Sequence, residues 1–239
     1  MGAVGPNPSN EGATAPPSGP WADLALTLPI FIGYHLGVIF LPVRNAADVV
    51  TRELVSLANH SMLAYGGLTL AIGAVFVGVL VSLGRGKALR WERFALVAAE
   101  GIAYAITLRL VAGYVVGRLF LGPVDHDAFS GLVMSLGAGF YEEIAFRVLL
   151  FSWGAKLFHL LFPIAIPFKA KLVTLGWAVV AAGIFSGWHY VGALGDSFDA
   201  RSFVFRWVAG LIFTVIYFFR GFAPAVWTHA LYDIWVLVL

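Results

Sequence analysis

Two carboxylates and one guanidinium lie close together inside a strongly apolar part of the chain. Glu142, Glu143 and Arg147 fall within six consecutive positions. On a helix, Glu143 and Arg147 are four residues apart with the acid first, which is the favourable order for an ion pair. Glu142 then points about 100° away. This spacing predicts that Arg147 neutralises Glu143 and that Glu142 is free to take part in catalysis. The alternative is that all three residues form a structural polar cluster between helices.

Two later apolar segments carry polar side chains at the same helical spacing. Phe185 precedes His189 by one turn, and His229 precedes Asp233 by one turn. Residues four positions apart share one face of a helix. A buried charge must be paired or functional, so we expect the three segments to direct these groups toward one another. Carboxylates and imidazoles gathered in this way can exchange protons with a substrate or a water molecule.

The composition places these groups in a membrane. The chain has 239 residues, of which 60% are hydrophobic and 12% charged, whereas a soluble domain is about half apolar and a quarter charged. We therefore predict an all-α integral membrane protein. The formal net charge of +2 is too small to indicate a nucleic-acid partner. The absence of cysteine excludes disulfides, thiolate metal sites and a cysteine nucleophile.

The hydropathy pattern predicts a polytopic bundle of about seven to eight transmembrane helices. Residues 1–20, rich in Gly, Pro and Ser, predict a flexible tail and not a signal peptide, and residues 21–239 form a single transmembrane domain. A segment at 157–167 is too short to cross alone, so it either extends the fourth span or lies in the membrane interface. The seven apolar spans are 24–41, 62–83, 94–121, 130–155, 172–191, 203–219 and 222–239.

Loop charges predict the orientation of the bundle. The basic segments 85–93 and 156–171 alternate with the acidic segments 122–129 and 194–199. The positive-inside rule then places the N-terminus in the cytoplasm and the C-terminus outside, unless 157–167 crosses and reverses the later half. These boundaries contain one conflict, since Glu142 falls near mid-membrane and His189 near the outer end of its helix. A shared site therefore requires a tilted helix or a shifted boundary.

Taken in order, the three motifs resemble those of a known family. Glu142-Glu143-x-x-x-Arg147, Phe185-x-x-x-His189 and His229-x-x-x-Asp233 resemble the signature of the CAAX prenyl endopeptidase family, also called the CPBP or ABI family of glutamic intramembrane proteases. The resemblance covers about 130–239. The last motif of the family is usually His-x-x-x-Asn, and this chain has Asp233 there. An Asn side chain can donate to an oxyanion, whereas an ionised Asp cannot.

The resemblance implies a division of catalytic labour. Glu142 and His189 would activate a water, and His229 with Asp233 would stabilise the tetrahedral intermediate, while Glu143, Arg147 and Phe185 support them. Asp233 would be protonated or would orient His229, unless its role has moved elsewhere. Members have also been described as metal-dependent, and Glu142, His189 and His229 could form a three-ligand zinc set. Because the sequence contains no His-Glu-x-x-His, we favour a reaction without a cofactor.

The leading hypothesis is therefore an intramembrane endopeptidase. It would hydrolyse a peptide bond near the C-terminal anchor or lipidated end of a membrane-associated protein or peptide, with the lipid bilayer as its other partner. The short chain and the lack of targeting signals favour a prokaryotic plasma membrane. Two alternatives stay open: a proton- or ion-coupled transporter that uses Glu142, Glu143, His189 and His229 as a relay, and a catalytically inactive membrane scaffold.

Overall fold

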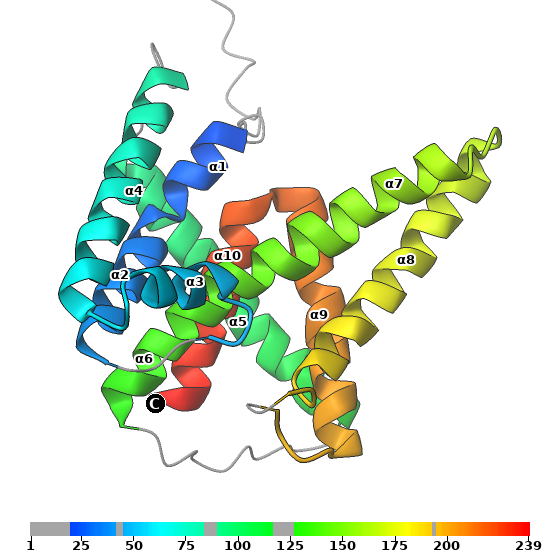
Figure 1. Ribbon diagram of the computed structural model, residues 1–239. Coiled ribbons are helices and arrows are strands. Elements are labelled where there is room, and N and C mark those ends of the chain that lie inside the picture. Colours follow the sequence, from blue (N-terminus) through cyan, green and yellow to red (C-terminus); the bar gives the residue numbers. More distant parts are fainter. Residues whose placement is uncertain (1–19, 42–44, 84–89, 117–126, 193–194) are drawn as a thin grey trace, which may run out of the picture.

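The computed structural model describes residues 20–41, 45–83, 90–116, 127–192 and 195–239. Throughout these residues the regular structure is helical (Figure 1), which confirms the predicted all-α membrane bundle. The predicted tail at 1–20 lies outside the described residues except for Pro20, which begins α1. The elements are α1 (Pro20–Leu26), α2 (Leu28–Phe40), α3 (Val49–Leu57), α4 (Met62–Leu83), α5 (Trp91–Val116), α6 (Ala128–Gly137), η1 (Ala138–Glu142), η2 (Ile144–Trp153), α7 (Gly154–Leu161), α8 (Pro167–Trp188), α9 (Ala200–Arg220) and α10 (Phe222–Leu237).

Each of the seven predicted apolar spans forms a helical segment, but the segments differ in length. Among the described residues, five helices are long and apolar enough to cross a membrane, and α2 and α10 are shorter. The first predicted span is broken at Thr27, which precedes α2. Pro29 lies in the first turn of α2, where its missing N–H is tolerated. The predicted end of the third span, 117–121, lies outside the described residues.

The fourth span continues into the short segment at 157–167, which was one of the two predicted possibilities. Ala128–Leu161 is one continuous 34-residue helix that includes part of the short segment at 157–167. Its middle, η1 and η2, has the wider π-helical hydrogen bonding, which often occurs at functional sites. A helix of this length exceeds a hydrocarbon core about 30 Å thick, so it tilts or extends beyond the core. Figure 1 shows that it runs diagonally past the other helices. Glu142 Oε2 lies 3.8 Å from His189 Nε2, and this proximity removes the conflict in depth between the two residues.

Helix α10 lies at the centre of the bundle and packs against the helix Ala128–Leu161, called the motif helix below because it carries Glu142, Glu143 and Arg147. It packs on α1, α5, α6, η1 and α9. At Gly139, an added Cβ would lie 2.7 Å from the Ala230 Cβ and 2.9 Å from the Val226 carbonyl oxygen. A side chain cannot be accommodated at such distances without moving a helix. The glycine therefore allows the close approach that brings the carboxylates beside His229.

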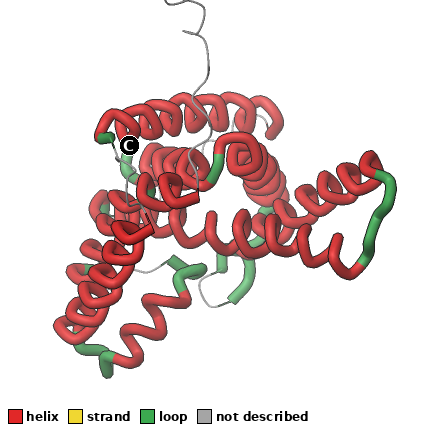
Figure 2. The backbone as a smooth tube through the Cα atoms, turned by 90° about the horizontal axis from the view of Figure 1, so that it is seen from above, coloured by secondary structure: helices red, strands yellow, loops and turns green. Residues whose placement is uncertain are grey.

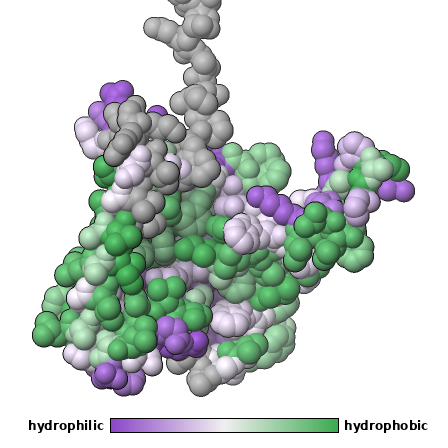
Figure 3. All heavy atoms as spheres, turned by 45° about the horizontal axis from the view of Figure 1, so that its top comes forward, coloured by the Kyte–Doolittle hydropathy of each residue, from purple (hydrophilic) through white to green (hydrophobic). Residues whose placement is uncertain are grey.

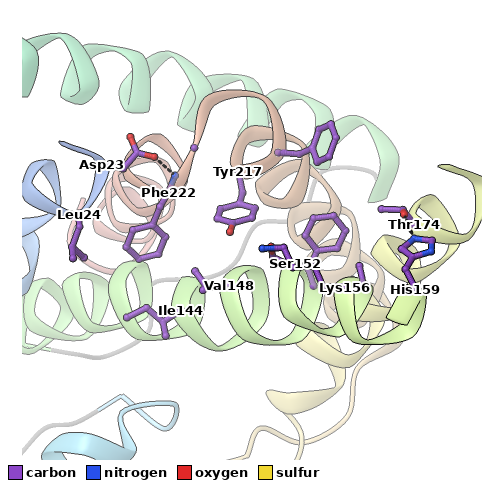
Figure 4. A pocket seen from close by; sticks show the side chains of 14 residues that line it. Asp23, Leu24, Ile144, Val148, Ser152, Lys156, His159, Thr174, Tyr217 and Phe222 are labelled. Carbon is purple, nitrogen blue, oxygen red and sulfur yellow. Dashed lines mark hydrogen bonds between the residues drawn. The ribbon is translucent and has the colours of Figure 1, made fainter. Parts of the chain in front are cut away.

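The α7–α8 pair forms a hairpin that leans away from the other helices (Figures 1 and 2). Apolar side chains cover much of the visible surface, with hydrophilic groups toward its edges (Figure 3). Between the hairpin and the α9–α10 turn lies a cavity of about 970 Å³ (Figure 4). Val148, Ser152, Lys156, His159 and Tyr217 are among its lining residues. None of the predicted site residues lines this cavity, so the chemistry must be sought elsewhere.

The two ends of the bundle differ in charge, and this difference supports a testable orientation. Described cations at the end formed by the α5 start, the hairpin tip and the α9 terminus are Arg90, Arg93, Lys156, Lys169, Lys171 and Arg220. The opposite end, where α6 and α9 begin, carries Asp127, Asp196 and Asp199 together with Arg201 and Arg206. The positive-inside rule predicts that the basic end is cytoplasmic.

Single cysteines would report this orientation cleanly, because the chain has none of its own. Ala165 is exposed at the hairpin tip, and Ser197 is exposed at the opposite end. In intact cells, a membrane-impermeant maleimide should label Ser197→Cys, and it should label Ala165→Cys only after permeabilisation. The reverse pattern would mean that the bundle is inserted the other way round.

Candidate active site

The carboxylates of the motif helix are almost completely buried. The exposed fraction is 6% for Glu142, 0% for Glu143 and 1% for Arg147. Arg147 Nε lies 3.1 Å from Glu143 Oε2, as an ion pair and without hydrogen-bond alignment. The guanidinium also lies over the rings of Phe185 and Phe213, at 4.3 and 5.1 Å from their centroids, which is the geometry of a cation–π interaction. The ion pair predicted from the i,i+4 spacing is therefore present.

Glu143 has a second contact that the spacing did not reveal. Its Oε1 atom is 2.7 Å from Nδ1 of His229. An ionised carboxylate can only accept, so His229 donates through Nδ1 and its Nε2 atom is turned toward the other acids. That Nε2 atom lies 3.9 Å from Glu142 Oε2 and 3.5 Å from Asp233 Oδ2. The His229 ring stacks on Phe213 with a centroid distance of 4.4 Å, which fixes the plane of the imidazole.

His189 approaches the same carboxylate from α8. It follows the last residue of α8, and its Nδ1 atom donates to the carbonyl oxygen of Phe185 at 3.0 Å. Its Nε2 atom consequently faces Glu142 Oε2 at 3.8 Å. Glu142 Oε2 itself is buried and has no hydrogen-bond partner among the described residues. Separations of 3.8 and 3.9 Å exceed a direct hydrogen bond but can be bridged by one shared oxygen atom.

Asn45 was not predicted and lies at the centre of the arrangement. Its Nδ2 atom donates to Glu142 Oε1 at 2.8 Å, its Oδ1 accepts from Ala47 N at 2.8 Å, and its backbone N donates to Tyr34 Oη at 3.2 Å. Tyr34 in turn donates to Asp48 at 2.7 Å. The N-terminal half of the chain thus holds one oxygen of Glu142 and turns the other toward the histidines. An asparagine between two helices carries no sequence signal that could have singled it out.

Five of the seven predicted site residues share one cavity of about 250 Å³, and Glu143 and Arg147 are not among its lining residues. Glu142, His189, His229, Asp233 and Phe185 all line it. Phe185 packs edge-on against both imidazoles, with ring centroids 5.0 Å from His189 and 6.0 Å from His229. The lining of the cavity also includes residues that the motifs do not specify: Asn45, Met134, Ala138, Phe205, Arg206, Ala209, Phe213, Tyr232, Val236 and Leu237.

The zinc alternative rests on the same three residues as the metal-free reaction, Glu142, His189 and His229. Within the described ranges, no group of three His, Asp or Glu side chains is arranged to hold a metal ion. Glu142 and the two histidines do converge, but Glu142 Oε1 and His229 Nδ1 are already engaged by Asn45 and Glu143. Glu142 Oε2 lies 3.8 Å from His189 Nε2 and 3.9 Å from His229 Nε2, and one shared oxygen atom can bridge each of these separations.

Comparison with known proteins agrees with the motifs. Residues 125–235 match the family model of the Rce1-like type II CAAX prenyl endopeptidases. This match supports the assignment that the three motifs predicted, to the CAAX prenyl endopeptidases, which are a family of proteases. The matched segment contains all three motifs, and the residues before it, including Asn45, lie outside it. No curated protein and no solved structure matches the chain.

Proposed function

We propose that this protein is an intramembrane endopeptidase in which Glu142 and His189 activate the attacking water. The observation that supports it most directly is the position of Glu142 Oε2. This oxygen faces the Nε2 atoms of both His189 and His229 at bridging distance, inside a cavity in an otherwise apolar bundle. A buried carboxylate whose other oxygen is already hydrogen-bonded is suited to act as a general base.

The reaction can be written with these side chains alone. A water held between Glu142 Oε2 and His189 Nε2 attacks the peptide carbonyl carbon, and Glu142 takes its proton as the C–O bond forms. The carbonyl oxygen becomes an oxyanion. A donor positioned for that oxyanion stabilises it more than the substrate. Glu142 then passes the proton to the amide nitrogen, the C–N bond breaks, and the two product chains carry a new carboxylate and a new amine.

His229 is the proposed oxyanion donor. Its Nδ1–H is used by Glu143, so its Nε2 atom can donate only when the ring is an imidazolium. Glu143 and Asp233 contact its two nitrogens at 2.7 and 3.5 Å, and both negative charges favour that charged form. This assigns Asp233 a role that differs from the donor function of the usual Asn: it holds His229 charged and oriented. Arg147 and Glu143 act as positioning residues behind it.

Cleavage of a membrane-anchored peptide by the purified protein tests the proposal. In proteoliposomes, the wild type should cut the peptide near its C-terminal anchor, while His229→Ala should cut it at least about 100-fold more slowly, the usual loss for an oxyanion donor. A chelator should leave the rate unchanged. A wild type that conducts protons but never cuts would favour the relay function, and one that does neither would favour a scaffold.

Removing the Asn45 side chain should weaken catalysis without removing the base. A hydrogen bond to a charged group contributes about 1.5–3 kcal/mol, which corresponds to roughly 10- to 150-fold in rate if it is needed to aim Glu142. We therefore expect Asn45→Ala to lower kcat by at least about tenfold with little change in KM. Ser56→Ala, on the exposed face of α3, is the matched control. An unchanged kcat in Asn45→Ala would show that Glu142 does not need this contact.

A further inference from the structure

Arg206 brings a permanent positive charge to the proposed catalytic cavity. It is one of the lining residues and projects from the second turn of α9, a helix whose start is capped by Asp199 through Ser202 N at 2.7 Å. Within the described lining of this cavity, the other ionisable groups are acids, imidazoles and a tyrosine. The catalytic scheme proposed above gives no role to Arg206.

Residues of the segment that follows His189 hold the Arg206 guanidinium in place. Its Nη2 atom donates to Asp196 Oδ2 at 2.6 Å. Its central carbon lies 5.3 Å from the centre of the Tyr190 ring. Because Tyr190 and Asp196 belong to the segment that continues from His189, the position of the cation is tied to that of a proposed catalytic residue. A guanidinium restrained in this way loses little further freedom when it binds a ligand.

One nitrogen atom of this guanidinium, Nη1, makes no hydrogen bond to the described residues. Nη1 of Arg206 is shielded from solvent and has no hydrogen-bond acceptor among the described residues. A buried donor without a partner is unfavourable and calls for an explanation. Asp196 occupies one side of the fork and leaves Nη1 for a second acceptor. Carboxylates match the planar fork of arginine better than other acceptors in peptides do.

The surroundings of Arg206 suit the end of a peptide. The cavity lining also contains apolar residues, among them Phe205, Ala209 and Val236. Phe213, on which His229 stacks, follows Arg206 by seven residues on α9, about 10 Å along the helix axis. A few extended residues, at about 3.3–3.6 Å each, cover such a distance. A cavity of about 250 Å³ has room for a short segment of chain and not for a folded domain.

We propose that Arg206 binds the free C-terminal carboxylate of the substrate. Resting on the peptidase function proposed above, this makes Arg206 a specificity-determining residue: it selects chain ends and places the scissile bond a few residues before the terminus. A chain that continues past this point, or one whose end is amidated, offers no carboxylate to the guanidinium. The same contact holds the leaving fragment while its new amine receives the proton from Glu142.

Paired substrates test the assignment. Two membrane-anchored peptides of one sequence, ending in a free carboxylate or a carboxamide, are incubated with the full-length protein in proteoliposomes. The wild type should favour the acid by at least about tenfold in kcat/KM, chiefly through KM. Arg206→Gln should reduce that preference to less than about threefold, and Arg206→Lys should restore part of it, because lysine keeps the charge but not the fork. Arg201→Gln, an exposed arginine of the same helix, should keep the preference.

The outcomes separate this inference from the function on which it rests. Equal cleavage of both peptides by the wild type would overturn the carboxylate contact and leave the peptidase function standing. Equal loss on both peptides in Arg206→Gln would show a structural role and also overturn it. If the wild type cleaved neither peptide, the peptidase function itself would fail, and the role of Arg206 with it.

Discussion

Glu142→Gln is expected to reduce peptide hydrolysis by about 10³-fold or more while the protein stays folded. Glutamine keeps the size of the side chain and an oxygen that can accept from Asn45, whose Nδ2 atom lies 2.8 Å from Glu142 Oε1. It cannot take a proton from water, and a positioned general base contributes about 10²–10⁴-fold. Loss of the charge opposite His189 and His229 adds to the effect. The measurement is kcat on a membrane-anchored peptide, with thermal unfolding as a check on folding.

A second membrane-helix acid provides the control for this substitution. Glu100 pairs with Arg220 at 2.6 Å and does not line the cavity that contains Glu142. Glu100→Gln should therefore keep most of the activity. If Glu142→Gln retained more than about a tenth of the wild-type rate, another group would have to be the base. A loss shared equally by Glu100→Gln would indicate a general effect of removing buried charge.

The centre of the site could be predicted because membranes leave few options for charged side chains. A carboxylate or imidazole inside an apolar helix must face another polar group, and helical spacing states which neighbours share its face. This reasoning predicted the Glu143–Arg147 pair, which is present at 3.1 Å, and it predicted that His189 and His229 would approach Glu142. It could not predict that both adjacent acids contact one ring of His229, because ideal α-helical geometry separates them by about 100°.

The residues and boundaries that could not be predicted are those that no sequence pattern marks. Asn45 and Arg206 reach the cavity from segments where polar residues are ordinary, so only the folded arrangement reveals them. Hydropathy likewise reports which residues avoid water but not where one helix stops. It therefore left open whether the segment from 157 continues the fourth span, as it does in Ala128–Leu161, and it joined α1 and α2 across Thr27.

The second large effect concerns stability, at Arg147. Arg147→Met should destabilise the protein by about 3–5 kcal/mol, the usual cost of removing one partner of a buried ion pair, because Glu143 then keeps only His229 as a charged partner. Arg147 is 1% exposed and Glu143 is 0% exposed, so water cannot replace the lost cation. The substitution also removes the contacts of the guanidinium with the rings of Phe185 and Phe213. Unfolding by denaturant in detergent micelles should show a lowered midpoint.

A double variant distinguishes an unpaired charge from simple loss of packing. In Glu143→Gln with Arg147→Met, both members of the Glu143–Arg147 pair are neutral and His229 keeps Asp233 at 3.5 Å; replacing both members of a buried pair by neutral groups is often tolerated. This variant should recover most of the stability that Arg147→Met loses, yet remain poorly active because His229 no longer faces a charged acceptor at 2.7 Å. Equal instability of the single and double variants would show that packing dominates. Recovery of stability without recovery of cleavage would establish that the ion pair serves to position His229, because folding and catalysis would then respond separately to the same two side chains.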